Sequence, residues 1–142
     1  MGNANSASLP ALQTVANCNT ELFMGTWFVI GVKPTIFEKT CSNAVEKYTL
    51  QERKRGFDVY IDFQYNEDNP ISSKLKALPQ KGWIQGDDRA NSANWKVSPL
   101  WPIKMPFPII ELDEKDYSYC VIGFPNRDYC WIMSRTSKGT GS

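Results

Sequence analysis

Histidine is absent from this chain of 142 residues. Its absence excludes Ser-His-Asp and Cys-His catalysis and the usual zinc sites, because each of these needs an imidazole. An excess of charge of one sign is missing too, since 16 lysines and arginines stand against 15 aspartates and glutamates. This balance gives no electrostatic reason to expect nucleic acid as a partner, or strong unaided attraction to anionic lipid.

Long apolar runs are also missing. No stretch approaches the roughly 20 residues of a spanning helix, and no secretory leader is present, so we expect a soluble chain whose leader, if it is exported, has been removed. The first six residues fit the loose pattern for N-myristoylation at Gly2, but we favour the simpler explanation, a short flexible tail of small residues. A single acyl chain would give only weak, reversible membrane association.

Aromatic residues, in contrast, are abundant: five Trp, six Tyr and seven Phe. This content suits a protein with a wide apolar interior. The clearest periodicity lies in residues 57–66, where apolar and polar side chains alternate as they do in a strand with one face buried and the other wet. At this length we expect one domain.

Turn residues divide the chain into short strands with no long helical pattern, which predicts an all-β barrel or sandwich. An amphipathic lead-in, residues 9–23, precedes them. Residues 99–108 hold four prolines and are expected to form an apolar loop. Residues 33–42 form a loop that offers Phe37 as part of a lid. The expected strands are residues 25–32, 44–51, 57–66, 71–86 with a bulge or bend at 79–82, 93–98, 109–112, 117–124 and 128–134.

Three short motifs stand in order along the chain: Gly25-x-Trp27, Leu112-Asp113-x-x-Asp116-Tyr117-x-Tyr119 and Trp131-Ile132-x-Ser134-Arg135. Together they resemble the signatures of the lipocalin family. Phe37-Glu38-Lys39 and Asn43-Ala44-Val45-Glu46-x-Tyr48 are closer to one branch, which holds the bacterial outer-membrane lipocalins, apolipoprotein D and the temperature-induced plant lipocalins. The resemblance covers about residues 20–136.

The resemblance implies an eight-stranded antiparallel up-and-down barrel that carries or stores a small hydrophobic ligand, such as a fatty acid or lysophospholipid. It places the protein in a secreted, periplasmic or membrane-periphery location. We assign residues 1–18 to a tail and lead-in, 19–136 to the barrel and 137–142 to a flexible tail. No cofactor is required, although a bound lipid, carotenoid or bilin would fit.

Arg135 and Trp27 are expected to meet. In an up-and-down barrel the eighth strand ends at the level where the first begins, so Arg135 returns to the side of Trp27 and Gly25. A guanidinium lying over an indole stabilises by about 0.5 to 2 kcal/mol. This contact would close one end of the barrel and leave the other open.

Alternation along the strands predicts which side chains line the interior. In a closed sandwich the same residues would be plain core, but the motifs favour a cavity for an elongated lipophile with its polar head near the mouth. The predicted ligand-binding residues are Val29, Phe37, Tyr48, Phe57, Val59, Ile61, Phe63, Leu75, Trp95, Val97, Ile110, Tyr129 and Trp131.

The acidic residues give no catalytic pair and no metal site. Glu46 shares the parity of Tyr48, so its carboxyl either serves a polar group of the ligand or, as we favour, lies near enough to the mouth to be hydrated. Asp113 and Asp116 precede Tyr117 in a turn and are expected to accept backbone N–H groups.

Four cysteines leave the redox compartment open. Cys120 and Cys130 would face each other only if the last hairpin is symmetric about Pro125. In the apolipoprotein D-like relatives a cysteine near position 41 pairs with one in the tail, which this chain lacks, so we expect Cys41 to be free or paired in another way. A thiol nucleophile would lack an activating base.

The family resemblance also implies a helix after the eighth strand, whereas only residues 136–142 remain. Cys130 and Ile132 would then be uncovered, which indicates a shortened chain or a homodimer through that wall. Two alternatives to carriage stay open: an isomerase or de-epoxidase-like enzyme acting on a lipophile, and a membrane-surface interaction protein.

Overall fold

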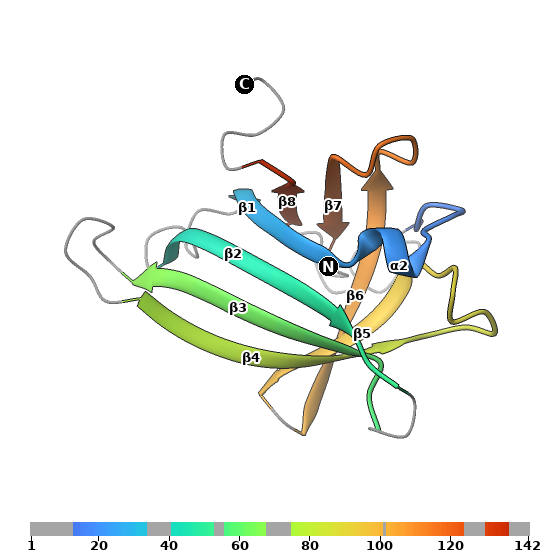
Figure 1. The fold of residues 1–142 in the computed structure, drawn as a ribbon, viewed down its shortest axis with the longest axis horizontal. Coiled ribbons are helices and arrows are strands. Elements are labelled where there is room, and N and C mark those ends of the chain that lie inside the picture. The colour runs from blue at the N-terminus through green and yellow to red at the C-terminus, as the bar shows by residue number, and fades with distance from the viewer. Residues whose placement is uncertain are drawn as a thin grey trace, which may run out of the picture.

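The structure is a computed structural model that describes residues 13–33, 41–52, 56–67, 75–100, 102–123 and 130–136. Eight strands close into one antiparallel barrel in which each strand pairs with the next and β8 returns to β1 (Figure 1). The predicted all-β barrel is therefore confirmed. The strands are β1 (Gly25–Lys33), β2 (Cys41–Leu50), β3 (Val59–Glu67), β4 (Leu75–Ile84), β5 (Asn94–Leu100), β6 (Ile103–Leu112), β7 (Tyr119–Gly123) and β8 (Cys130–Ser134).

The N-terminal lead-in crosses one end of the barrel, which we call the closed end. The Val15 amide donates to the Ile109 carbonyl (3.0 Å), and the Thr20 amide donates to the Ala90 carbonyl (3.0 Å). One turn of helix comes next, α2 (Thr20–Phe23), capped by Asn19, whose side chain accepts from the Leu22 amide. At the opposite, open end, the connections at residues 34–40, 68–74 and 124–129 lie outside the described part of the chain.

Most of the proline-rich segment lies in two strands, since residues 99–100 end β5 and residues 103–108 begin β6, so the prediction of a loop at residues 99–108 was wrong. The Ile109 amide donates to the Ala93 carbonyl (2.8 Å), so the backbone nitrogen of Ile109 points toward the β5 side. Successive backbone nitrogens in a strand point alternately to its two neighbouring strands. The nitrogens of Pro106 and Pro108 therefore point away from β5, toward the β7 side. In the described residues β7 pairs with β6 only from Ile109 onward, so neither proline removes a ladder hydrogen bond.

Irregularities in the sheet also differ from the prediction. The β3–β4 register runs unbroken from Leu75 to Gly82, so the expected bulge or bend at residues 79–82 does not occur. Register shifts instead lie between Val29 and Gly31 in β1, between Ser42 and Val45 in β2, between Val97 and Leu100 in β5, and between Ile109 and Glu111 in β6. Each shift inserts an extra residue and reverses the face on which the later residues of that strand lie.

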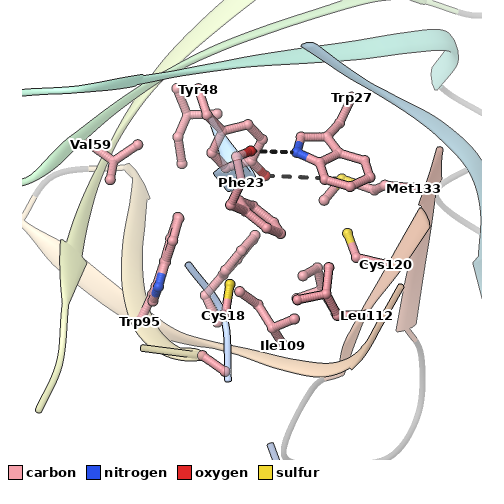
Figure 2. Close-up of a cluster of buried hydrophobic side chains, with 14 of the residues drawn as sticks. Cys18, Phe23, Trp27, Tyr48, Val59, Trp95, Ile109, Leu112, Cys120 and Met133 are labelled. Carbon is pink, nitrogen blue, oxygen red and sulfur yellow. Dashed lines mark hydrogen bonds between the residues drawn. The ribbon is translucent and has the colours of Figure 1, made fainter. Parts of the chain in front are cut away.

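The core lies inside the barrel toward the closed end, where side chains from the strands and the lead-in converge (Figure 2). Phe23 projects from α2 into the middle of this group. The hydrophobic core cluster consists of Cys18, Phe23, Trp27, Tyr48, Val59, Ile61, Ala93, Trp95, Val97, Phe107, Ile109, Leu112, Tyr117, Cys120, Ile122 and Met133.

The last hairpin separates its cysteines. Cys120 lies opposite Met133, and Cys130 lies opposite Gly123, so the symmetric register that would join them does not form. Both thiols are free, as is that of Cys18. The side chain of Cys41 lies outside the described part of the structure.

The outer wall around β1 and β8 carries exposed apolar side chains. Ile30 is 41% exposed and Ile132 is 39% exposed, and Cys130 is half-buried beside them. The expectation that Ile132 is left uncovered is confirmed.

Candidate ligand-binding site

Arg135 closes the barrel beneath Trp27. Its guanidinium carbon lies 3.7 Å from the centroid of the Trp27 ring, which confirms the predicted contact. The Trp27 indole N–H in turn donates to the Phe23 carbonyl (2.8 Å), so the ring is fixed from both sides (Figure 2). Arg135 is half-buried, and a guanidinium shielded from water interacts more strongly with an aromatic face.

The same guanidinium satisfies carbonyl groups that helix α2 leaves unpaired. Nη2 donates to the carbonyls of Leu22 (2.8 Å), Phe23 (3.2 Å) and Met24 (3.0 Å). Nη1 donates to Thr26 (2.8 Å). Five donors in a planar fork make this possible, which a lysine could not reproduce. Arg135 thus ties the lead-in to the end of β8.

Gly25 allows the chain to turn from α2 into β1. Its φ is +100°, a region that residues with a Cβ rarely adopt. An added Cβ would lie 3.5 Å from Nη1 of Arg135, which is ordinary contact. The need for glycine is therefore conformational.

Aromatic rings form the floor of the interior. Phe23 packs edge-on against Tyr48 with centroids 5.4 Å apart, and edge-on against Trp95 at 5.2 Å. Trp95 stacks on Phe107 at 5.8 Å. These side chains are buried, so the closed half of the barrel is filled by the protein itself.

The open half is different, because inward-facing apolar side chains there remain partly exposed. Leu78 lies opposite the buried Phe63 and so faces inward, yet it is 38% exposed. Trp131 lies opposite the buried Ile122, and its ring packs 5.7 Å from that of Phe63. Trp131 and Val29 are half-buried. Directly opposed residues share a face of the sheet, so Leu78 and Trp131 face the interior. Because both remain partly exposed, solvent reaches the interior at this end.

Most of the predicted interior residues lie where the alternation places them. Tyr48, Val59, Ile61, Trp95 and Val97 belong to the core cluster, and Val29 and Trp131 pack against it. Their contact with a ligand stays a prediction. Phe37 and Tyr129 lie outside the described residues, and the side chain of Leu75 is not described.

Two residues that were predicted to face the interior, Ile110 and Phe57, lie outside the core cluster. Ile110 is half-buried and outside the cluster, whereas Ile109 is fully buried, because the bulge at this point shifts the alternation. Phe57 precedes β3, is half-buried, and has its ring 5.1 Å from Nζ of the exposed Lys81.

Two interior residues were not predicted from the sequence. Phe23 comes from the lead-in, and Phe107 from the segment expected to be a loop. Met133 shares the inward-facing parity of Trp131, and it lies in the core cluster opposite Val29 as that parity predicts.

Glu46 is buried in the interior, so the expectation that it is hydrated near the mouth was wrong. It is 2% exposed, and Tyr48 Oη donates a hydrogen bond to its carboxyl. Burial raises the pKa of Glu46 to about 7, although the hydrogen bond from Tyr48 opposes this rise. Burial and the neighbouring Glu46 both raise the pKa of Tyr48, which therefore stays protonated.

The remaining candidate groups in the described residues are the buried cysteines and Asp113. Burial raises the pKa of the Cys18 thiol to about 12 and also raises that of Cys120, which disfavours a thiolate nucleophile at either position. The Asp113 carboxylate accepts from the Ser118 hydroxyl and from the amides of Lys115, Asp116 and Ser118, and these bonds lower its pKa. This confirms Asp113 as a structural acceptor.

The described part of the chain holds no group of three or more side chains that could bind a metal ion. None of its helices is long and apolar enough to cross a membrane.

Comparison with known sequences gives consistent matches. A family model described as a lipocalin-like domain matches residues 18–140. The chain is 26% identical over 141 residues to temperature-induced lipocalin-1 of Arabidopsis thaliana, a match that covers 89% of this chain and 68% of the plant protein. It is 31% identical over 122 residues to outer membrane lipoprotein Blc of Citrobacter freundii, covering 86% of this chain and 64% of that protein.

Comparison with solved structures gives the same fold. Insecticyanin from the tobacco hornworm Manduca sexta superposes with a TM-score of 0.62 at 14% identity, covering 90% of this chain and 69% of insecticyanin. Apocrustacyanin C2 superposes with a TM-score of 0.58 at 15% identity, covering 87% and 66% of the two chains. The chain thus spans about two thirds of the length of its relatives.

Proposed function

The chain belongs to the lipocalin-like family, whose eight-stranded barrels can hold one small ligand, and from this premise we propose that it binds and carries or stores a small hydrophobic ligand in the open half of its barrel. The observation that carries the proposal is the partial exposure of inward-facing apolar side chains at that end. Val29, Leu78 and Trp131 would lose contact with water on binding, which stabilises the complex by about 25 cal/mol for each Å² of apolar surface removed.

Tryptophan fluorescence tests this proposal directly. Trp131 faces the open interior, so titration with a fatty acid, a lysophospholipid or a carotenoid should change its emission in a saturable way. A Trp131→Phe variant should lose most of the signal. Trp83→Phe is the matched control, since Trp83 faces outward, with Nζ of Lys104 4.1 Å from its ring centroid, and this variant should keep the signal.

Two results would count against carriage. One is unchanged fluorescence with every class of lipophile. The other is an equal response in Trp131→Phe and the unmodified protein, which would place the ligand elsewhere. Mass spectrometry of the purified protein would identify a ligand retained during purification.

We also propose a location at the membrane periphery. The support is the name of the bacterial relative, an outer membrane lipoprotein. Cys18 is buried in the core cluster, which does not suit it for lipid attachment. Fractionation of the source cells with an antibody to the chain would test the location.

A further inference from the structure

Glu46 is an unusual residue for the inside of a barrel that holds lipophiles. In the register of the sheet it lies opposite Trp27 on one side and Phe63 on the other, both of which are buried. Of the side chains that the structure describes, it is the only acidic or basic one that is buried. Placing a carboxylate there is costly unless something compensates its charge.

The protein itself gives this carboxyl little compensation. A carboxylate can accept about four hydrogen bonds, but within the described residues Glu46 receives one, from Tyr48. Tyr48 Oη also approaches Met133 Sδ (4.0 Å), and a phenol has only one proton to donate (Figure 2). No lysine or arginine of the described ranges forms an ion pair with Glu46. The carboxyl therefore keeps unused acceptor capacity.

Tyr48 is held rigidly, which fixes the direction from which Glu46 can be approached. Its ring contacts those of Phe23 (5.4 Å), Trp95 (6.1 Å) and Phe107 (6.4 Å) on the side of the closed end. Toward the open end, the next buried residue of β2 is Ala44, whose side chain is a single methyl group. A ligand would thus reach Glu46 from the mouth.

We propose that Glu46, positioned by Tyr48, recognises the buried end of a lipophile that carries a hydrogen-bond donor, and that long-chain primary amines are the class that fits best. This inference rests on the proposed function. An ammonium group brings three donors and a compensating charge, whereas an alcohol brings one donor and no charge. A fatty carboxylate brings a like charge and no donor, so it is disfavoured at this position. The alkyl chain would lie against Val29, Phe63 and Trp131.

Binding of an amine should depend on pH because the acid titrates near neutrality. Burial raises the pKa of Glu46 to about 7, whereas an alkylammonium stays charged well above pH 8. Glu46 interacts electrostatically with Tyr48 on the same strand and with Cys120 on β7. Arg135, after β8, interacts with both of these groups, and Cys18 on the lead-in interacts with Cys120. Burial holds the pKa values of Tyr48, Cys120 and Cys18 above their ordinary values and an arginine stays charged, so none of these groups changes charge between pH 6 and 8. The affinity for an amine should therefore rise across this interval as Glu46 ionises.

The test compares decylamine, decanol and decanoic acid, which share one chain length, by calorimetry at pH 8. The unmodified protein should bind the amine at least about tenfold more tightly than the acid. In Glu46→Gln, which keeps the shape and removes the charge, this preference should fall to roughly threefold or less. Glu111→Gln is the control, since Glu111 is exposed, and it should behave as the unmodified protein.

The outcomes separate this inference from the proposed function. Binding of all three compounds with no preference for the amine, or a preference that survives Glu46→Gln, overturns the inference and leaves carriage intact. Binding of none of them overturns both. If Glu46→Gln does not fold, the pH series decides with the unmodified protein: an amine affinity that rises several-fold from pH 6 to 8 supports the inference, and a flat one overturns it.

Discussion

Replacing Glu46 with glutamine should stabilise the protein at neutral and alkaline pH. The folded carboxyl has a pKa of about 7, against an ordinary value of 4.5. Folding therefore takes up a proton at pH values between these two. The contribution of this carboxyl to the free energy of unfolding is fully present below pH 4.5, falls as the pH rises to 7 and is constant above pH 7. The difference between the folded and the ordinary pKa corresponds to about 3 kcal/mol of unfolding free energy, since one pKa unit is about 1.4 kcal/mol.

Glutamine carries no charge at any pH, and it can still accept the hydrogen bond from Tyr48. Glu46→Gln should consequently match the unmodified protein near pH 4.5 and exceed it by up to about 3 kcal/mol at pH 8. Urea unfolding at a series of pH values, followed by near-ultraviolet circular dichroism, measures this difference without ligand. The exposed Glu111 provides the control, because Glu111→Gln should shift stability by the same small amount throughout.

A constant gap between Glu46→Gln and the unmodified protein from pH 4.5 to 8 would refute the reasoning. It would mean that the folded carboxyl ionises as easily as in water. The burial of Glu46 and its shortage of hydrogen bonds would then not carry the cost assigned to them here.

Three further predictions concern the closed end and the outer wall. Arg135→Lys should lower the free energy of unfolding by roughly 2 kcal/mol, because an ammonium cannot bond to four carbonyls and stack on Trp27 at once; equal denaturant midpoints would contradict this. Gly25→Ala should cost about 1 to 2 kcal/mol in thermal unfolding through its positive φ, and an unchanged melting temperature would remove that argument. Light scattering should show a dimer, and Ile132→Lys should disrupt it. Ile103→Lys is the control, because it alters an exposed residue on another strand, and it should leave the dimer intact. A monomer at all concentrations would exclude the dimer.

Much of the barrel could be predicted because its determinants are local. Alternation in β3 and the motifs around Trp27 and Arg135 depend on neighbouring residues in the chain. Once eight strands run up and down, geometry alone brings the last beside the first. The contact between Trp27 and Arg135 follows without knowledge of any side-chain packing.

The errors arose where a residue's role depends on a partner far away in sequence. Pro106 is tolerated in β6 because, in the described residues, β7 pairs with β6 only from Ile109 onward. The residues next to the proline in the sequence do not reveal where this pairing begins. A bulge reversed the face of Ile110 for a similar reason. The depth of Glu46 depends on the cover that Trp27 and Phe63 provide, and no local pattern encodes it.

The ties made by Arg135 also constrain when this protein can fold. Its guanidinium bonds to residues that precede it by 109 to 113 positions, and β1 pairs on one side with β8. Contacts of such long sequence separation form slowly, and here they require the chain to be available from α2 through Arg135. Until β8 pairs with it, β1 keeps an unpaired strand edge, and such edges promote aggregation, so we expect the refolding protein to aggregate more readily when β8 is prevented from pairing with β1.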